Sequence, residues 1–185
     1  MKLFKNIPFL VSLLSILVLG ANYAQSSRNT TEEPPSFEEI FTEEGYKTVN
    51  AALDDFEQHF NQQLKLPFRV PPISFTHQFG RFNNLDGEIN DTFEMNFISD
   101  QFPGNHFKID VRPLKHKIDF SDKLIPKTFK LNSGTIALYE DKLVRGFNLL
   151  IFEKDGWQYV FSINKKVADE VTPEILVQIA NSIDY

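Results

Sequence analysis

After a cluster of prolines in the first half of the chain, the spacing of the apolar residues changes from that of a helix to that of strands. Pro67, Pro71 and Pro72 mark the change, because proline lacks the backbone donor of a helix and clashes with the preceding turn. Before them, across residues 47–66, apolar side chains recur every three or four positions and form one helical stripe: Val49, Leu53, Phe56, Phe60 and Leu64. We therefore expect a helix that packs on a sheet formed by the residues that follow.

Apolar and polar residues alternate after the prolines, and such alternation predicts strands with one buried face and one wet face. The clearest alternating apolar residues are Phe93, Met95, Phe97, Phe107, Ile109 and Val111. Further strands are expected at residues 73–77, 128–131, 135–139, 145–152 and 158–163. Asp155 and Gly156 predict a short hairpin turn between the last two strands, because both residues tolerate positive φ.

A second helix is predicted at the C-terminal end of the chain. Thr172 is a suitable N-cap, and Pro173 suits the first helical position. The buried stripe of this helix would contain Ile175, Leu176, Ile179 and Ile183. Residues 46–185 are therefore expected to form one α+β domain: a single antiparallel sheet of about six to seven strands with an N-terminal and a C-terminal helix packed on it.

The first residues of the chain have the layout of a secretory signal peptide. Lys2 and Lys5 precede an apolar run at residues 7–19, which is shorter than the ~20 residues that a transmembrane helix needs. We expect residues 1–24 to direct export, so that the protein is extracytoplasmic, either secreted or held at the cell envelope; a retained signal anchor is the alternative. Residues 25–45 are expected to form a polar tether that ends in a short helical turn capped by Ser36.

Residues 17–21 are similar to a bacterial lipoprotein signal, with Ala21 at the position of the lipid-accepting cysteine. Cysteine is absent from the whole chain, so neither a thiol-linked lipid nor a disulfide is available. The chain is 42% hydrophobic, which is ample for a folded core. Its net charge of −6 argues against nucleic acid as a partner, because proteins that bind nucleic acid usually present a basic face.

The sequence has no motif of the common enzyme classes. It contains no phosphate-binding glycine loop, no calcium-loop pattern and no Gly-x-Ser-x-Gly nucleophile elbow. The spacings of His106 and His116, with Asp110 and Asp119, match no known metal-ligand pattern. We therefore assign no catalytic, cofactor-binding or metal-binding residue, and we expect a protein that is not an enzyme and has no cofactor.

Charge is distributed unevenly along the chain. Residues 30–60 are rich in Asp and Glu, whereas residues 108–130 contain seven Lys or Arg residues. The candidates for contact with an anionic surface, either membrane head groups or wall polymer, are Lys108, Arg112, Lys115 and Lys117. The alternative, which we favour, is that these basic residues neutralise the acidic helix within the same domain.

Six short segments carry a resemblance to a known family: residues 66–72 (LPFRVPP), 79–82 (FGRF), 109–113 (IDVRP), 138–139 (LY), 157–159 (WQY) and 179–183 (IANSI). Together they resemble a domain of unknown function found in envelope proteins of Gram-positive, spore-forming bacteria. Those proteins include small lipoproteins and the outer parts of membrane-anchored regulators. The resemblance implies an extracytoplasmic α+β domain without an assigned reaction, and it transfers no site residues. Ala21 departs from the lipoprotein members, which puts membrane tethering in doubt.

Three functions are compatible with the sequence. The first is an exported, non-catalytic envelope or secreted module that binds an envelope protein, a wall polymer or an anionic membrane surface. The second is a carrier or sensor of a lipid-like ligand, enclosed by strands that bear Phe75, Phe79, Phe93, Phe97 and Phe107. The third is a hydrolase with a scattered carboxylate site. An enclosed apolar cavity would favour the carrier, and convergent carboxylates with perturbed pKa values would favour the hydrolase.

Overall fold

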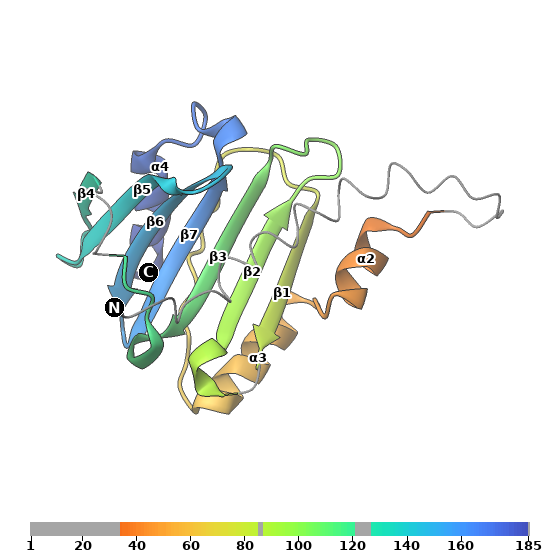
Figure 1. The fold of residues 1–185 in the computed structure, drawn as a ribbon, viewed down its shortest axis with the longest axis horizontal. Helices are drawn as coiled ribbons and strands as arrows, with labels where there is room; N and C mark the ends of the chain where they lie inside the picture. The colour runs from red at the N-terminus through yellow and green to blue at the C-terminus, as the bar shows by residue number, and fades with distance from the viewer. Residues whose placement is uncertain (1–33, 85–86, 121–126, 185) are drawn as a thin grey trace, which may run out of the picture. The chain divides into compact units, whose positions relative to one another are not determined.

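The computed structural model describes residues 34–84, 87–120 and 127–184, and these form one seven-stranded antiparallel sheet with helices packed on it (Figure 1). The expected signal segment and most of the tether lie outside the described residues. The strands are β1 (His77–Asn83), β2 (Thr92–Ile98), β3 (His106–Pro113), β4 (Lys127–Lys130), β5 (Ile136–Val144), β6 (Phe147–Lys154) and β7 (Trp157–Asn164). The expected α+β class with a single antiparallel sheet is confirmed.

Two runs of neighbouring strands build this sheet. β1, β2 and β3 pair in succession, and the chain then passes to the far edge at β4. From there β5, β6 and β7 pair back toward the middle, where β7 pairs with β3. Asp155 and Gly156 form the expected turn between β6 and β7, with φ angles of 49° and 87°. As a result β2, β3, β7, β6 and β5 all have neighbours on both sides, and β1 and β4 are the edge strands.

The two longer helices lie on the same side of the sheet, behind it in the view of Figure 1. They are α3 (Val49–Phe60) and α4 (Pro173–Asn181), while the short α2 (Phe37–Glu43) lies beside the β1 edge. The prediction of one helix over residues 47–66 was too long, because Asn61 adopts the left-handed conformation and ends α3. Within the described residues, no helix combines the length and the apolar character needed to cross a membrane.

The apolar stripes of both helices and the odd-numbered residues of β2 and β3 form the core. Phe56 of α3 and Leu176 of α4 are fully buried in it. The strands contribute Phe93, Phe97, Phe107, Ile109, Val111, Tyr159, Phe161 and Ile163. Aromatic rings contact one another at the centre: the Phe56 ring centroid lies 5.8 Å from that of Phe93 and 5.0 Å from that of Trp157. Phe60, in contrast, is only partly buried at the rim.

Gly80 of β1 allows α3 to approach the sheet closely. A Cβ atom at this position would lie 2.7 Å from the Val49 Cα atom and 2.9 Å from the Ala52 Cβ atom. Next to this contact, Lys47 and Gly80 exchange two backbone hydrogen bonds, of 2.9 and 2.8 Å. The chain that enters α3 is therefore fastened to β1 at the point where only glycine fits.

The prediction that β2 and β3 have one wet face is wrong. All seven residues of β2 are buried, and so is β3 from Phe107 to its end. The odd-numbered residues of both strands face the helices, so the even-numbered ones lie on the opposite side, which we call the front face. Several of the charged side chains buried there pair with one another, which lowers the cost of their burial.

Candidate functional site

Four charged side chains on three neighbouring strands form a cluster on the front face. They are Arg81 of β1, Glu94 of β2, and Lys108 and Asp110 of β3, and we call them the charged cluster. The strand register brings them together, because Arg81 lies opposite Glu94 and Glu94 lies opposite Asp110. The side chains of Lys108 and Asp110 are only 2% and 1% exposed.

Glu94 accepts hydrogen bonds from three side chains on two segments of the chain. Its Oε2 atom accepts from the Tyr46 hydroxyl and from Arg81 Nη2, each at 2.8 Å. Its Oε1 atom accepts from Asn83 Nδ2 at 2.8 Å. These donors fasten the residues before α3 and the β1 edge strand to the middle of the sheet.

Lys108 lies between the two carboxylates and forms an ion pair with each. Its Nζ atom is 2.9 Å from Asp110 Oδ1 and 3.4 Å from Glu94 Oε1. The other carboxylate oxygen, Asp110 Oδ2, is buried and has no hydrogen-bond partner. The same holds for the hydroxyl of Ser162, which lies on β7 directly opposite Lys108. Two buried polar atoms without partners therefore lie on the front face, on adjoining strands.

The members of the charged cluster have pKa values that are shifted in different directions. Burial would raise the pKa of Glu94, but the charges of Lys108 and Arg81 with their hydrogen bonds lower it to about 2. Burial raises the pKa of Asp110 to about 6, because Lys108 offsets it only in part and Glu94 adds to it. The pKa of Lys108 is raised, since its two carboxylate neighbours outweigh its burial. Near neutral pH, Glu94 and Lys108 are thus charged and Asp110 is close to its titration range.

A chain of neutral polar groups extends the cluster toward the other end of the strands. Asn96 Nδ2 donates to the Tyr46 hydroxyl at 3.1 Å. His106 Nε2 lies 3.1 Å from Asn96 Oδ1, so the ring donates to the amide oxygen through that nitrogen. Burial, together with the nearby charge of Lys108, lowers the pKa of His106 to about 4. The imidazole is therefore neutral at physiological pH.

The structure does not bring the four predicted basic contact residues together on an exposed surface. Lys108 is buried in the charged cluster and Arg112 is also buried, so their assignment to an anionic-surface contact was wrong. Lys115 and Lys117 are about half exposed, and they form ion pairs with Glu88 and Glu153. The carboxylates that pair with Lys108, Lys115 and Lys117 lie outside α3. In these pairs, therefore, the basic residues do not neutralise the acidic helix, which was the alternative that we favoured.

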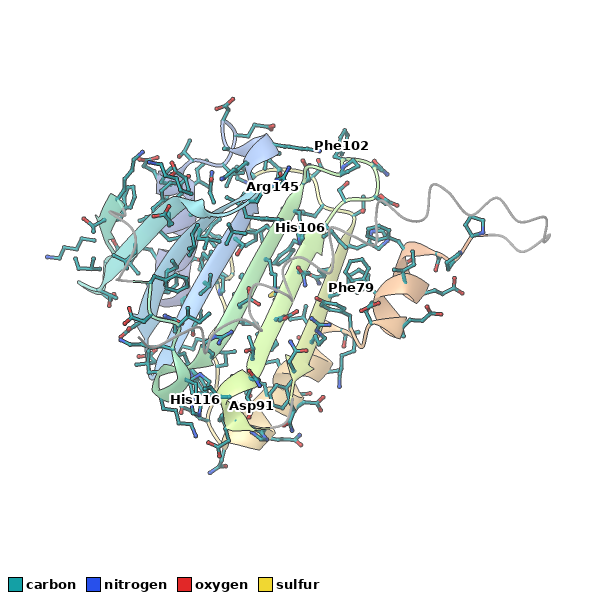
Figure 2. All side chains as sticks on the ribbon, in the orientation of Figure 1. Phe79, Asp91, Phe102, His106, His116 and Arg145 are labelled. Carbon is teal, nitrogen blue, oxygen red and sulfur yellow. The ribbon has the colours of Figure 1, made fainter. Side chains whose placement is uncertain are left out.

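The histidines that were considered as metal ligands lie far apart. His106 begins β3 and His116 follows its end, so the two lie at opposite ends of the strand (Figure 2). His59 and His77 instead form separate pairs with Asp91 and Glu38, at 2.8 and 2.9 Å. In the ranges 34–84, 87–120 and 127–184 no three His, Asp or Glu side chains are placed to hold a metal ion.

The phenylalanines that were proposed to enclose a lipid-like ligand lie on different sides of the sheet. Phe93, Phe97 and Phe107 belong to the core beneath the helices. Phe79 instead stacks on Phe41 of α2, with a centroid distance of 4.6 Å. These rings pack against other aromatic rings, and they do not together line one cavity for a lipid-like ligand.

Sequence reasoning missed Arg81, Glu94 and Ser162. A signal was present, because Glu94 and Asn96 are polar residues at alternate positions of an apolar strand, as Lys108 and Asp110 are. Their meaning depends on the register that sets Glu94 opposite Asp110. No family model, no curated protein and no solved structure matches this chain. The site must therefore be interpreted from its own geometry.

Proposed function

We propose that this protein is an exported, non-catalytic binding module of the cell envelope and that it binds a polar ligand at the charged cluster. The unpaired Asp110 Oδ2 and Ser162 Oγ atoms carry the proposal. A buried polar atom without a hydrogen bond costs about 1–3 kcal/mol, so a fold tends to retain such atoms where another molecule completes them. Both atoms lie beside Lys108, which already holds its two carboxylates in place.

The N-terminal sequence and the charge balance support the setting of this module. The signal-like segment at residues 1–24 and the resemblance to envelope domains both favour a place outside the cytoplasm. The partner is then an envelope protein, a wall polymer or a small molecule derived from one. Contact with an anionic membrane surface would depend on Lys115 and Lys117, and both already have carboxylate partners.

Native mass spectrometry of the full chain tests the binding proposal. The protein is mixed with the polar, low-molecular-weight fraction of a bacterial envelope extract, and bound masses are recorded. We expect a bound species on the wild type that Ser162→Ala and Asp110→Asn weaken or abolish. Ser133→Ala, in the turn before β5, is the matched control and should bind as the wild type does. Identical spectra for all four proteins would refute a ligand at the cluster.

A hydrolase is the second candidate, and one observation favours it. Glu94 and Asp110 form a direct cross-strand pair, and their pKa values are about 2 and about 6. A carboxylate that stays ionised beside a carboxyl that titrates near neutral pH is the usual arrangement for acid–base catalysis. Incubation with dye-labelled wall polymer separates the two candidates. Soluble fragments released by the wild type but not by Asp110→Asn would establish hydrolysis, and intact polymer would leave the binding module.

A further inference from the structure

Lys108, Asp110 and Ser162 are buried neighbours on the front face of two adjoining strands. Lys108 and Ser162 face each other across β3 and β7, and residues paired in this way have Cβ atoms about 4.5–5.5 Å apart. Asp110 is the next residue of β3 on the same face. Asp110 and Ser162 are both buried, and each has a polar atom without a partner. One group on the front face of these two strands would therefore face all three side chains.

The donors and acceptors of Lys108, Asp110 and Ser162 that have no partner in the protein indicate which chemical group a ligand would place beside them. An ionised Asp110 offers an acceptor at Oδ2. The Lys108 ammonium has three donors and two carboxylate partners, so one donor is left over. The Ser162 hydroxyl can donate or accept. The complementary group donates one hydrogen bond and accepts another, and a single hydroxyl does both.

The charges argue against an anionic ligand at this position. Arg81 and Lys108 balance Glu94 and Asp110, and the buried Arg112, on the same face of β3, adds a positive charge that acts on Asp110. A ligand carboxylate placed beside Lys108 and Ser162 would still lie against the Asp110 carboxylate, which is unfavourable at low dielectric. An uncharged hydroxyl avoids that cost. We infer that the ligand of the charged cluster is a polyol or a sugar that places one hydroxyl between Lys108, Asp110 and Ser162. This inference rests on the proposed binding function and names its ligand class.

Protein-observed NMR of the full chain tests the ligand class at about neutral pH. N-acetylglucosamine and ribitol are the hydroxyl probes, and acetate is the carboxylate probe. We expect saturable shifts of the backbone amides of Asp110 and Ser162 with a hydroxyl probe and none with acetate. Ser162→Ala should weaken that binding about fivefold, as expected for one lost hydrogen bond, whereas Ser133→Ala should leave it unchanged. Because the Ser162 hydroxyl has no partner in the protein, its removal should not lower the melting temperature.

The outcomes separate the ligand class from the binding function. Acetate shifts at Asp110 and Ser162 without sugar or polyol shifts would overturn the hydroxyl inference and leave the proposed function standing. The absence of shifts with every probe would also overturn it, and the envelope-extract experiment would then decide the binding function alone. Hydroxyl-probe binding that Ser162→Ala does not change would place the ligand elsewhere and overturn the inference as well.

Discussion

Asp110 couples the stability of this fold to pH. Burial is the main cause that raises the pKa of its carboxyl from 3.8 to about 6 in the folded protein. The folded state therefore holds this proton more tightly than the unfolded chain does. Protonation of Asp110 adds its full contribution to the free energy of unfolding below pH 3.8, and this contribution is lost as the pH rises through about 6. Asp110→Asn cannot ionise, so it should lack this loss, which is on the order of 3 kcal/mol. Urea unfolding between about pH 4.5 and 7 measures the difference.

His106 should produce the opposite slope and serves as the companion variant. Its pKa is lowered from 6.5 to about 4, mainly by burial, so its contribution is full above pH 6.5 and is lost as the pH falls toward 4. Asp110→Asn should therefore lose stability on acidification, and His106→Gln should lose stability as the pH rises. The wild-type profile should be flatter, because the two contributions offset each other. Profiles of the same slope in both variants would contradict this account.

Lys108 is the residue whose replacement should cost the most in the charged cluster. Lys108→Met leaves the buried carboxylates of Glu94 and Asp110 without their shared counter-charge, so we expect a loss of about 3–5 kcal/mol. The matched control is Lys47→Met, because Lys47 pairs with Asp55 where both side chains are close to half exposed. That change should cost less than about 1 kcal/mol. Chemical denaturation at neutral pH compares the two, and equal losses would show that the buried pair matters no more than the exposed one.

At the scale of single elements, α3 is held by the stripe of apolar residues that its sequence predicts. Phe56 is fully buried against Phe93 and Trp157, so Phe56→Ala should cost about 3–5 kcal/mol. Asp54 lies on the exposed side of the same helix, and Asp54→Ala should cost less than about 0.5 kcal/mol. Denaturant melts of both variants test the assignment of the stripe. A similar loss in the two proteins would mean that α3 does not dock through Phe56.

The contact between α3 and β1 depends on the missing side chain of Gly80. In Gly80→Ala the new Cβ atom would meet the helix backbone at 2.7 Å, so α3 must shift, at a cost of about 1–3 kcal/mol. Gly104→Ala is the control, because its Cβ atom would meet only the Lys166 and Val167 side chains, the nearest atom being 3.3 Å away. Thermal melts should show a clear drop for Gly80→Ala and a small change for Gly104→Ala. Indistinguishable melts would show that α3 adjusts freely.

At the scale of the whole molecule, the signal-like N-terminal segment predicts how the protein is processed. We expect cleavage near Ala21 or Ala24, which would release a protein without an acyl chain because the chain has no cysteine. The intact mass of the protein recovered from outside the cell tests this. A mass increase of the size of a lipid would contradict the expectation, and so would a protein that still contains Met1.

The residues that face the core can be predicted from the amino-acid sequence, because apolar spacing is a local property of helices and strands. The stripe of α3, the alternating residues of β2 and β3, and the turn at Asp155 and Gly156 follow from it. The ends of helices and strands are harder to predict, since a single residue can decide where an element ends. Asn61 ends α3 before Leu64, and β1 runs through Gly80 to Asn83 although the pattern suggested a strand at residues 73–77.

The nature of the front face depends instead on contacts between distant parts of the chain. Alternation shows that Glu94, Lys108 and Asp110 point away from the helices, and it suggests that they meet water. The strands beside them make their burial tolerable, because a buried charge is tolerated only when a counter-charge lies opposite. That partner is set by the order of the strands and their register, which bring β1, β2, β3 and β7 together from distant parts of the chain. The basic residues at 108 and 112 were therefore assigned to a surface when they belong to the interior.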